Sequence, residues 1–274
     1  MRYFILTIVL LAVAAFWHLI VFRMSPRLGL VKLNFNKTPI MASYGIVSFA
    51  YIAAIAGGLK LAGRIDVEHM VLYIAVMAAM WVLGIMDDVW GTREVGGFKG
   101  HFKKLILERK LTTGAVKALG GGVVGIIGGW WLSGGDPARW ITAALLIPLA
   151  SNILNLFDLR PGRAVAVFFL GIGVTWLQVG GSMSAPLLVG TISAVTLIFS
   201  IVDSRGKAMM GDSGSNMLGA ALGITMALNT NVVSQVIAIV VILAIHLYSE
   251  KHSVSALIDR NPVLRFIDRR LGVR

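Results

Sequence analysis

The chain has 274 residues, of which 57% are hydrophobic and only 14% are charged. Soluble domains carry about 25% charged and about 45–50% apolar residues, so this composition excludes an ordinary soluble globular protein. The formal net charge of +12 still needs an explanation, because a basic excess often indicates nucleic acid or an anionic lipid surface as the partner. The absence of cysteine excludes disulfides, thiolate zinc sites and cysteine nucleophiles.

The N-terminal segment has two interpretations. Arg2, a short apolar run and the small residues 12–14 resemble a cleaved signal peptide. Hydrophobic residues continue as far as Phe22, however, and the whole stretch is about as long as a bilayer is thick. We therefore expect a retained first transmembrane helix.

Uncharged apolar runs continue along the whole chain. A spanning helix needs about 20 mostly apolar residues, or about 17 when its ends are well anchored. Nine runs qualify: residues 3–22, 40–59, 70–86, 118–132, 140–156, 164–179, 185–202, 215–228 and 232–248. No hydrophilic stretch is long enough for a separate domain. The sequence therefore predicts an all-α, polytopic membrane helix bundle with about nine transmembrane helices in a single domain, residues 1–274.

The basic residues predict how the bundle is oriented. If the N-terminus lies outside, the odd-numbered connections and the C-terminal tail contain all but four of the 25 basic residues. The exceptions are Arg2, Lys60, Arg64 and Arg139. The positive-inside rule then places these connections in the cytoplasm. Most of the net charge is explained as an orientation signal, so we expect no nucleic-acid partner.

The fourth run contains Gly121, Gly125 and Gly129, a spacing that lets another helix approach closely. We expect this glycine face to pack inside the bundle. A homodimer contact is the alternative.

Aspartates at the predicted helix ends are the candidate functional residues. Asp87 and Asp88 end the third run, Asp158 follows the fifth, and Asp203 and Asp212 flank the connection after the seventh. All five fall on the predicted cytoplasmic side, where carboxylates could supply oxygen ligands to Mg²⁺. A single aspartate at a helix end is commonly a cap, but adjacent carboxylates repel unless a cation or a proton relieves them.

Two asparagines lie inside the fifth run. Asn152 and Asn155 are one helical turn apart and a further turn from Asp158, so the three share a helix face. Polar groups at this depth face the bundle interior or a wet cavity, and they are candidate functional residues. Hydrogen bonding between helices is the alternative role.

Two further segments carry groups suited to a phosphate. Residues 210–215 read Met-Gly-Asp-Ser-Gly-Ser and open the eighth run, where such residues present backbone N–H groups to an anion. Lys117 lies at the entrance of the fourth run and is a candidate phosphate ligand. The segment does not have the spacing of a P-loop, so neither signal is specific alone.

Together, the order and spacing of these segments resemble the polyprenyl-phosphate N-acetylhexosamine-1-phosphate transferase superfamily. That superfamily includes the phospho-N-acetylmuramoyl-pentapeptide transferase of peptidoglycan synthesis. The matching segments extend across most of the chain: Thr38-Pro39, Gly84-Ile-Met-Asp87-Asp88, Lys117, Asn152-Ile-Leu-Asn155-Leu-Phe-Asp158 and Met210-Gly-Asp212-Ser-Gly-Ser215.

The resemblance implies an activity and a location. The activity is a Mg²⁺-dependent transfer of a sugar 1-phosphate, an N-acetylhexosamine phosphate, from a UDP-sugar to polyprenyl (undecaprenyl) phosphate. This phosphotransferase reaction releases UMP and starts a cell-envelope glycan. The location is the lipid bilayer of the bacterial cytoplasmic (inner) membrane, with the active-site loops in the cytoplasm.

The resemblance also implies roles for single residues. Asp212 corresponds to the metal ligand, with Mn²⁺ as the alternative ion. Asp87 and Asp88 correspond to an acidic pair, of which Asp87 also helps to bind the metal, and Asp158 corresponds to the essential aspartate. The implied substrate-binding residues are Lys117, Asn152, Asn155, Ser213 and Ser215.

The loop after Asp158 departs from the family pattern. Pro161 stands where relatives commonly have a second aspartate, and the loop also contains Arg160 and Arg163. Arginine binds phosphate in a bidentate manner, so both arginines are candidate substrate ligands. The family's C-terminal histidine-rich loop is absent, and the sugar stays unidentified.

Two other functions fit the sequence less well. A catalytically altered relative would bind nucleotide sugar or lipid phosphate without turnover, and Pro161 is the main support for it. A transporter would show broken helices in two matching halves, and the sequence contains no such internal repeat.

Overall fold

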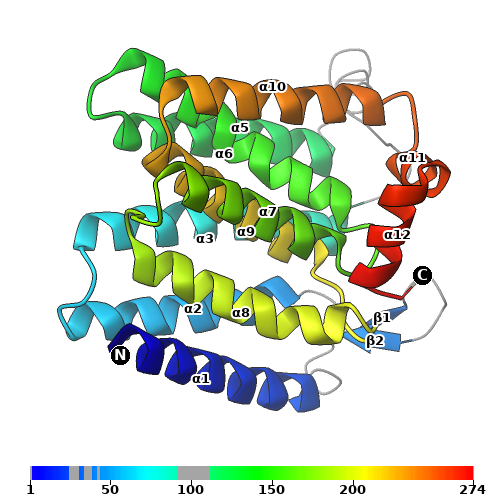
Figure 1. Cartoon of the computed structure of the whole chain (residues 1–274), viewed down its shortest axis with the longest axis horizontal. Coiled ribbons are helices and arrows are strands. Elements are labelled where there is room, and N and C mark those ends of the chain that lie inside the picture. Colours follow the sequence, from blue (N-terminus) through cyan, green and yellow to red (C-terminus); the bar gives the residue numbers. More distant parts are fainter. Residues whose placement is uncertain (1, 25–30, 34–38, 42–43, 92–111, 274) are drawn as a thin grey trace.

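The computed structural model is a bundle of long helices that lie side by side, with the chain passing back and forth between its two ends (Figure 1). The structure describes residues 2–24, 31–33, 39–41, 44–91 and 112–273. The long helices are α1 (Arg2–Met24), α2 (Tyr44–Leu61), α3 (Val67–Trp90), α5 (Thr113–Ser133), α6 (Pro137–Phe157), α7 (Arg163–Gln178), α8 (Pro186–Asp203), α9 (Gly211–Asn229) and α10 (Val232–Ser249). Two short helices follow, α11 (Val254–Arg260) and α12 (Pro262–Leu271).

Each of the nine predicted apolar runs overlaps one long helix, so the all-α prediction is confirmed. The number of spans differs from the prediction. Within the described residues, five helices (α3, α5, α6, α8 and α10) are long and apolar enough to cross a membrane, not nine. The described apolar stretches of α1, α2 and α7 are shorter, and α9 begins with a run of polar residues. Five such helices identify a multi-pass membrane protein.

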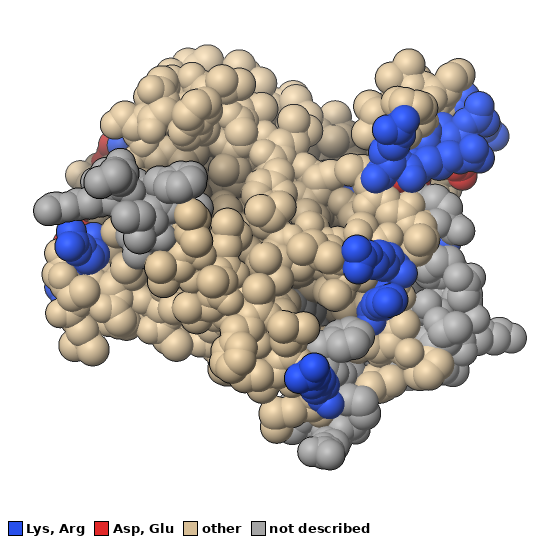
Figure 2. Space-filling model, turned by 60° about the horizontal axis from the view of Figure 1, so that its bottom comes forward, with Lys and Arg blue, Asp and Glu red and all other residues tan. Residues whose placement is uncertain are grey.

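The surface has the charge pattern expected of such a protein. Figure 2 shows one face whose broad middle is uncharged, with Lys and Arg toward its ends. Most of these cations lie at the end that carries α11 and α12. Many exposed side chains on α10 are large and apolar, among them Val236, Ile237, Val240 and Leu247. An apolar middle with charged ends suits a bilayer and its two headgroup layers.

A short β-ribbon was not predicted. Strands β1 (Val31–Leu33) and β2 (Pro39–Met41) pair antiparallel, with Val31 opposite Met41. The predicted second run begins at residue 40, but α2 begins only at Tyr44 because Ile40 and Met41 belong to β2. The carbonyl of Met41 also accepts a hydrogen bond of 2.7 Å from the backbone N–H of Met209. The ribbon is thus joined to the segment that leads into α9.

Helix α9 is the centre of the core. Every residue from Ser213 to Thr225 is buried. Its neighbours approach through glycines, because a Cβ on Gly84 of α3 would lie 2.4 Å from the carbonyl oxygen of Asp212. A Cβ on Gly219 of α9 would lie equally close, 2.4 Å, to the carbonyl oxygen of Ala150 in α6. Small residues allow such backbone contacts between membrane helices, and here they hold α9 between α3 and α6.

The predicted glycine face of α5 packs inside the bundle, as expected. A Cβ on Gly125 would lie 2.3 Å from the carbonyl oxygen of Ala144, and a Cβ on Gly129 would lie 2.7 Å from the backbone nitrogen of Ala144. Both contacts are with α6. The internal-packing interpretation is therefore confirmed, and a homodimer stays an untested prediction.

Replacing Gly219 with alanine should destabilise the bundle, because the new Cβ would meet backbone atoms of α6 that cannot move without shifting the helix. Overpacking of this kind costs about 1–3 kcal/mol. We expect a lower midpoint of thermal unfolding in detergent, followed by tryptophan fluorescence.

The matched control is Gly190→Ala in α8, where no described atom lies within 4 Å of an added Cβ. Its midpoint should be unchanged or slightly raised, because alanine favours helix more than glycine does. Equal midpoints for the two variants would contradict the packing of α9 on α6.

Candidate active site

Carboxylates from two other helices surround the amino end of α9. Asp88, near the end of α3, accepts hydrogen bonds from the backbone N–H groups of Asp212 and Ser213, both at 3.0 Å. Asp158, the C-cap of α6, accepts one from Gly211 at 3.1 Å. These donors have no partner within a helix, and the helix dipole favours an anion there. The sequence predicts that they face a substrate anion, but aspartates of the chain itself occupy them.

The surroundings of Asp158 also change how readily it ionises. Burial raises the pKa of Asp158 well above its usual range, and the negative charges of Asp203 and Asp212 raise it further. The hydrogen bond from Gly211 acts in the opposite direction. Burial and neighbouring negative charge therefore make Asp158 harder to ionise than an exposed aspartate, while the hydrogen bond from Gly211 favours its charged form.

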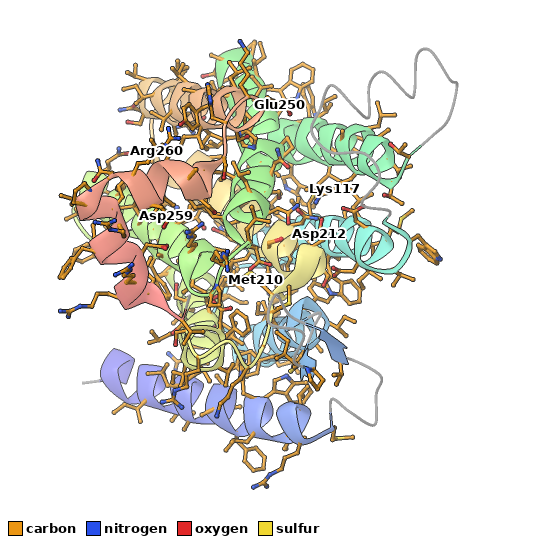
Figure 3. All side chains as sticks on the ribbon, turned by 90° about the vertical axis from the view of Figure 1, so that its right-hand side faces the viewer. Lys117, Met210, Asp212, Glu250, Asp259 and Arg260 are labelled. Atoms are coloured by element: carbon orange, nitrogen blue, oxygen red, sulfur yellow. The ribbon has the colours of Figure 1, made fainter. Side chains whose placement is uncertain are left out.

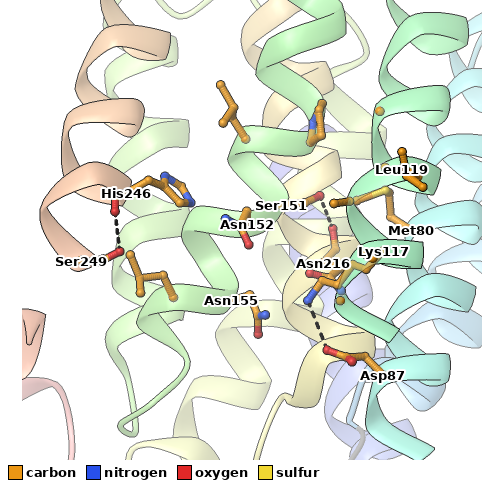
Figure 4. A pocket seen from close by; sticks show the side chains of 18 of the residues that line it. Met80, Asp87, Lys117, Leu119, Ser151, Asn152, Asn155, Asn216, His246 and Ser249 are labelled. Atoms are coloured by element: carbon orange, nitrogen blue, oxygen red, sulfur yellow. Dashed lines mark hydrogen bonds and ion pairs between the residues drawn. The ribbon is translucent and has the colours of Figure 1, made fainter. Parts of the chain in front are cut away.

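Lys117 connects two of the predicted aspartates. Its Nζ donates to Asp212 Oδ2 at 2.6 Å and lies 3.8 Å from Asp87 Oδ2. The two carboxyl groups are also within hydrogen-bonding reach of each other. Figure 3 shows Lys117 and Asp212 next to each other where the ends of α5 and α9 meet, and Figure 4 shows Lys117 extending toward Asp87. One ammonium group thus partly neutralises two adjacent carboxylates.

Asn155 orients this cluster from α6. Its Nδ2 donates to Asp212 Oδ2 at 3.1 Å, and its Oδ1 accepts a hydrogen bond from Ser215 Oγ at 3.2 Å. Ser213 and Ser215 are both fully buried. The Ser215 hydroxyl positions the Asn155 amide, whereas the Ser213 hydroxyl has no hydrogen-bond partner among the described residues. The structure therefore brings Asn155 of α6 into contact with Asp212 and Ser215 of α9.

The loop after Asp158 does not bring Arg163 to this cluster. Arg163 is 5% exposed, and its guanidinium binds Asp268 of α12 through two hydrogen bonds, Nε to Oδ1 at 2.6 Å and Nη2 to Oδ2 at 2.9 Å. Its Nη1 donates to Ser255 Oγ of α11 at 2.7 Å. Arg163 therefore fastens the C-terminal helices to the start of α7, while Arg160 lies half-buried in the preceding loop.

Asp203, at the end of α8, holds the loop between α6 and α7 in place. Its carboxylate accepts a hydrogen bond of 2.7 Å from the backbone N–H of Gly162, and it is buried. Gly162 has a φ of +82°, which glycine adopts without strain, and a Cβ there would lie 2.2 Å from the carbonyl oxygen of Leu271. The loop between α6 and α7 is thus held from two sides.

A cavity of about 570 Å³ opens beside Lys117, between α5, α6 and α10 (Figure 4). Asp87, Lys117, Asn152 and Asn155 line its charged and polar end. The remainder of the wall is largely apolar and includes Leu119, Leu145, Pro148, Leu149, Leu156 and Leu243. The cavity therefore leads from the carboxylate cluster to apolar surface between helices.

The cavity wall also contains five polar residues that were not predicted: Ser151, Asn216, His246, Ser249 and Glu250. Asn216 is fully buried, and neither atom of its side-chain amide has a hydrogen-bond partner among the described residues. The Nδ1–H of His246 donates to the carbonyl of Ile242 at 2.8 Å, while its Nε2 has no described partner. Asn216 is one turn after Asp212, so helical spacing could have identified it. Nothing in the sequence marks His246.

The described side chains of the cluster offer few ligands for a metal ion. Among the residues that the structure describes, no group of three His, Cys, Asp or Glu side chains could hold a metal. Asp87 and Asp212 are nevertheless adjacent carboxylates. Mg²⁺ commonly takes one or two carboxylates and completes its shell with water and substrate phosphate. The described residues therefore supply two adjacent carboxylates, fewer than a metal site built from protein side chains alone would need.

Comparison with known proteins does not assign the chain to a family. No protein-family model matches it, and no curated protein matches it in sequence. The superfamily named above is therefore a resemblance carried by short motifs, and the function has to be argued from the site.

Replacing Asp268 with alanine should destabilise the protein. Removing one partner of a buried ion pair leaves the other charge uncompensated, at a cost of about 3–5 kcal/mol. We expect a clearly lower midpoint of thermal unfolding for Asp268→Ala in detergent. Asp259→Ala, on the exposed surface of α11, is the matched control and should behave like the wild type. Identical midpoints for both variants would show that the Arg163–Asp268 pair is not formed.

Proposed function

We propose that the protein transfers a sugar 1-phosphate, an N-acetylhexosamine phosphate, from a UDP-sugar to polyprenyl phosphate and releases UMP. One observation carries this proposal: the cluster of Asp87, Lys117 and Asp212 lies at the end of a largely apolar cavity within a membrane bundle. A phosphate attached to a long hydrocarbon chain requires a charged and an apolar environment side by side. The motifs described above support the same reaction.

We also propose the finer topology that this function requires. All nine long helices would span the bacterial cytoplasmic membrane, with the N-terminus outside and the Lys117 cluster on the cytoplasmic face. Support comes from their side-by-side arrangement and from the gathering of cations at the end that carries α11 and α12 (Figures 1 and 2). The distribution of Lys and Arg in the sequence favours the same orientation.

The reaction needs positioning and charge neutralisation more than covalent chemistry from the protein. An oxygen of the polyprenyl phosphate attacks the β-phosphorus of the UDP-sugar, the bond to the bridging oxygen breaks, and UMP leaves with that oxygen. Lys117 lies where it can contact the phosphates. Asp87 and Asp212 would hold Mg²⁺, which when bound neutralises phosphate charge. Asn155 keeps the Asp212 carboxylate in its orientation.

A protein that binds lipid phosphate or nucleotide sugar without turnover is the second candidate. The loop after Asp158 favours it, because Pro161 replaces a carboxylate of the resembled family and the Arg163 guanidinium is buried against Asp268. In that case the cavity and Lys117 would bind ligand, but no sugar phosphate would be transferred.

Purified protein with Mg²⁺, undecaprenyl phosphate and a panel of radiolabelled UDP-sugars should form a product that extracts into organic solvent. Asp212→Asn should lower the rate at least about a hundredfold, since it removes one of the two carboxylates that would hold Mg²⁺ against the reacting phosphates. Asp66→Asn is the control. Asp66 is the N-cap of α3, whereas the α3 residues that contact Asp212 lie at the opposite, carboxyl-terminal end of that helix. Wild-type activity of Asp212→Asn would refute the assignment. Intact ligand binding without product from any donor would favour the second candidate.

Leu149→Trp tests whether the cavity holds the lipid chain. The larger side chain would fill part of the cavity beside α10. We expect the KM for undecaprenyl phosphate to rise about tenfold, equivalent to about 1.4 kcal/mol of lost binding, with little change for the UDP-sugar. Leu170→Trp, on an exposed position of α7, is the control. An unchanged KM for Leu149→Trp would place the lipid elsewhere.

A further inference from the structure

Helix α12 turns apolar side chains away from the bundle. Val263 is 66% exposed and Phe266 is 60% exposed, and Leu264 and Ile267 are also exposed. The residue that fastens the helix is instead the charged Asp268, which is 5% exposed and bound to Arg163. This arrangement is the reverse of a helix on a soluble protein, which buries its apolar side and exposes its charges.

Arginines accompany these apolar side chains. Arg265, Arg269 and Arg270 line a groove of about 320 Å³ together with Pro262 and Phe266, and no acidic residue lines it. The guanidinium carbon of Arg270 lies 4.9 Å from the centre of the Phe266 ring. Guanidinium groups bind phosphate through paired hydrogen bonds. The groove therefore combines apolar surface with groups that complement an anionic phosphate.

The position of α12 matches these chemical properties. Figures 1 and 3 show α11 and α12 crosswise to the long helices, at the end of the bundle where α10 finishes. Only a four-residue connection, in the described chain, separates Ser249 at the end of α10 from Val254 at the start of α11. Since α10 is of spanning length and composition, the short helices lie near the level at which it leaves the membrane. A crosswise amphipathic helix at that level lies in the interface.

We infer that α12 is an interfacial helix that binds anionic phospholipids. Val263, Phe266 and Ile267 enter the layer below the headgroups, and Arg265, Arg269 and Arg270 contact lipid phosphates. Apolar burial and attraction to anionic headgroups then act together. This role is separate from the transfer of sugar phosphate, so either proposal can fail without the other.

The absence of cysteine from the chain makes a direct test practical. The full-length Val263→Cys variant is labelled at its single cysteine with an environment-sensitive fluorophore. It is then placed in nanodiscs of phosphatidylcholine alone or of phosphatidylcholine with phosphatidylglycerol. The matched control is Asp259→Cys, at an exposed position on neighbouring α11. With phosphatidylglycerol present, we expect iodide to quench the label at 263 about threefold less than the label at 259. Changing Arg265, Arg269 and Arg270 to glutamine should remove this difference.

Three results would overturn the proposal. The first is equal quenching of the two labels in nanodiscs that contain phosphatidylglycerol. The second is shielding at 263 that is the same with and without the anionic lipid. The third is shielding that grows with protein concentration in detergent, which would identify a second copy of the chain as the occupant of this surface.

Discussion

The amino end of α9 sets the central requirement of this structure. The backbone N–H groups in the first turn of a helix have no partners within the helix, and where other helices pack against that turn they need partners from the protein. Asp88 and Asp158 supply those partners from α3 and α6. Their carboxylates therefore fix where three helices meet. The same turn carries Asp212, whose charge then requires Lys117 and Asn155. The acidic cluster is thus part of the fold as well as the candidate site.

The C-terminal helices belong to this arrangement although they lie outside the bundle of long helices. The Arg163–Asp268 pair holds α12 against the start of α7, and the Val273 N–H donates to the carbonyl of Ser204 at 2.8 Å. These contacts hold the loop between α6 and α7, which follows Asp158, and the loop between α8 and α9, which precedes Gly211. The buried ion pair therefore joins the C-terminal helices to the loop that follows Asp158.

Much of this arrangement could be predicted, and the reasons for success and failure are physical. A long apolar run indicates a helix of similar length, and each of the nine runs does overlap a helix. The alternation of helices brought Asp87, Asp88, Asp158 and Asp212 to one end. Hydropathy does not indicate which carboxylate accepts a hydrogen bond from a backbone N–H group and which one pairs with a lysine. The Arg163–Asp268 pair spans 105 residues and depends on tertiary packing, so the loop sequence suggested a phosphate ligand instead. The β-ribbon was not predicted because its three-residue strands are too short to show the alternation of apolar and polar residues that marks a strand.

Helix α10 forms one wall of the cavity, yet in the described structure it buries only Gln235, Ile239 and His246. Gln235 Nε2 donates to the carbonyls of Ala227 and Thr230, both at 3.0 Å, which anchors the amino-terminal part of α10. The carboxyl-terminal part, where His246 faces the cavity, has no comparable anchor among the described contacts within the bundle. Two partly buried residues of this part, Ile242 and Ile245, pack against the core of the bundle. The side of the cavity that α10 forms therefore rests mainly on apolar side-chain contacts, whereas α5 and α6 are joined by close backbone packing at Gly125 and Gly129.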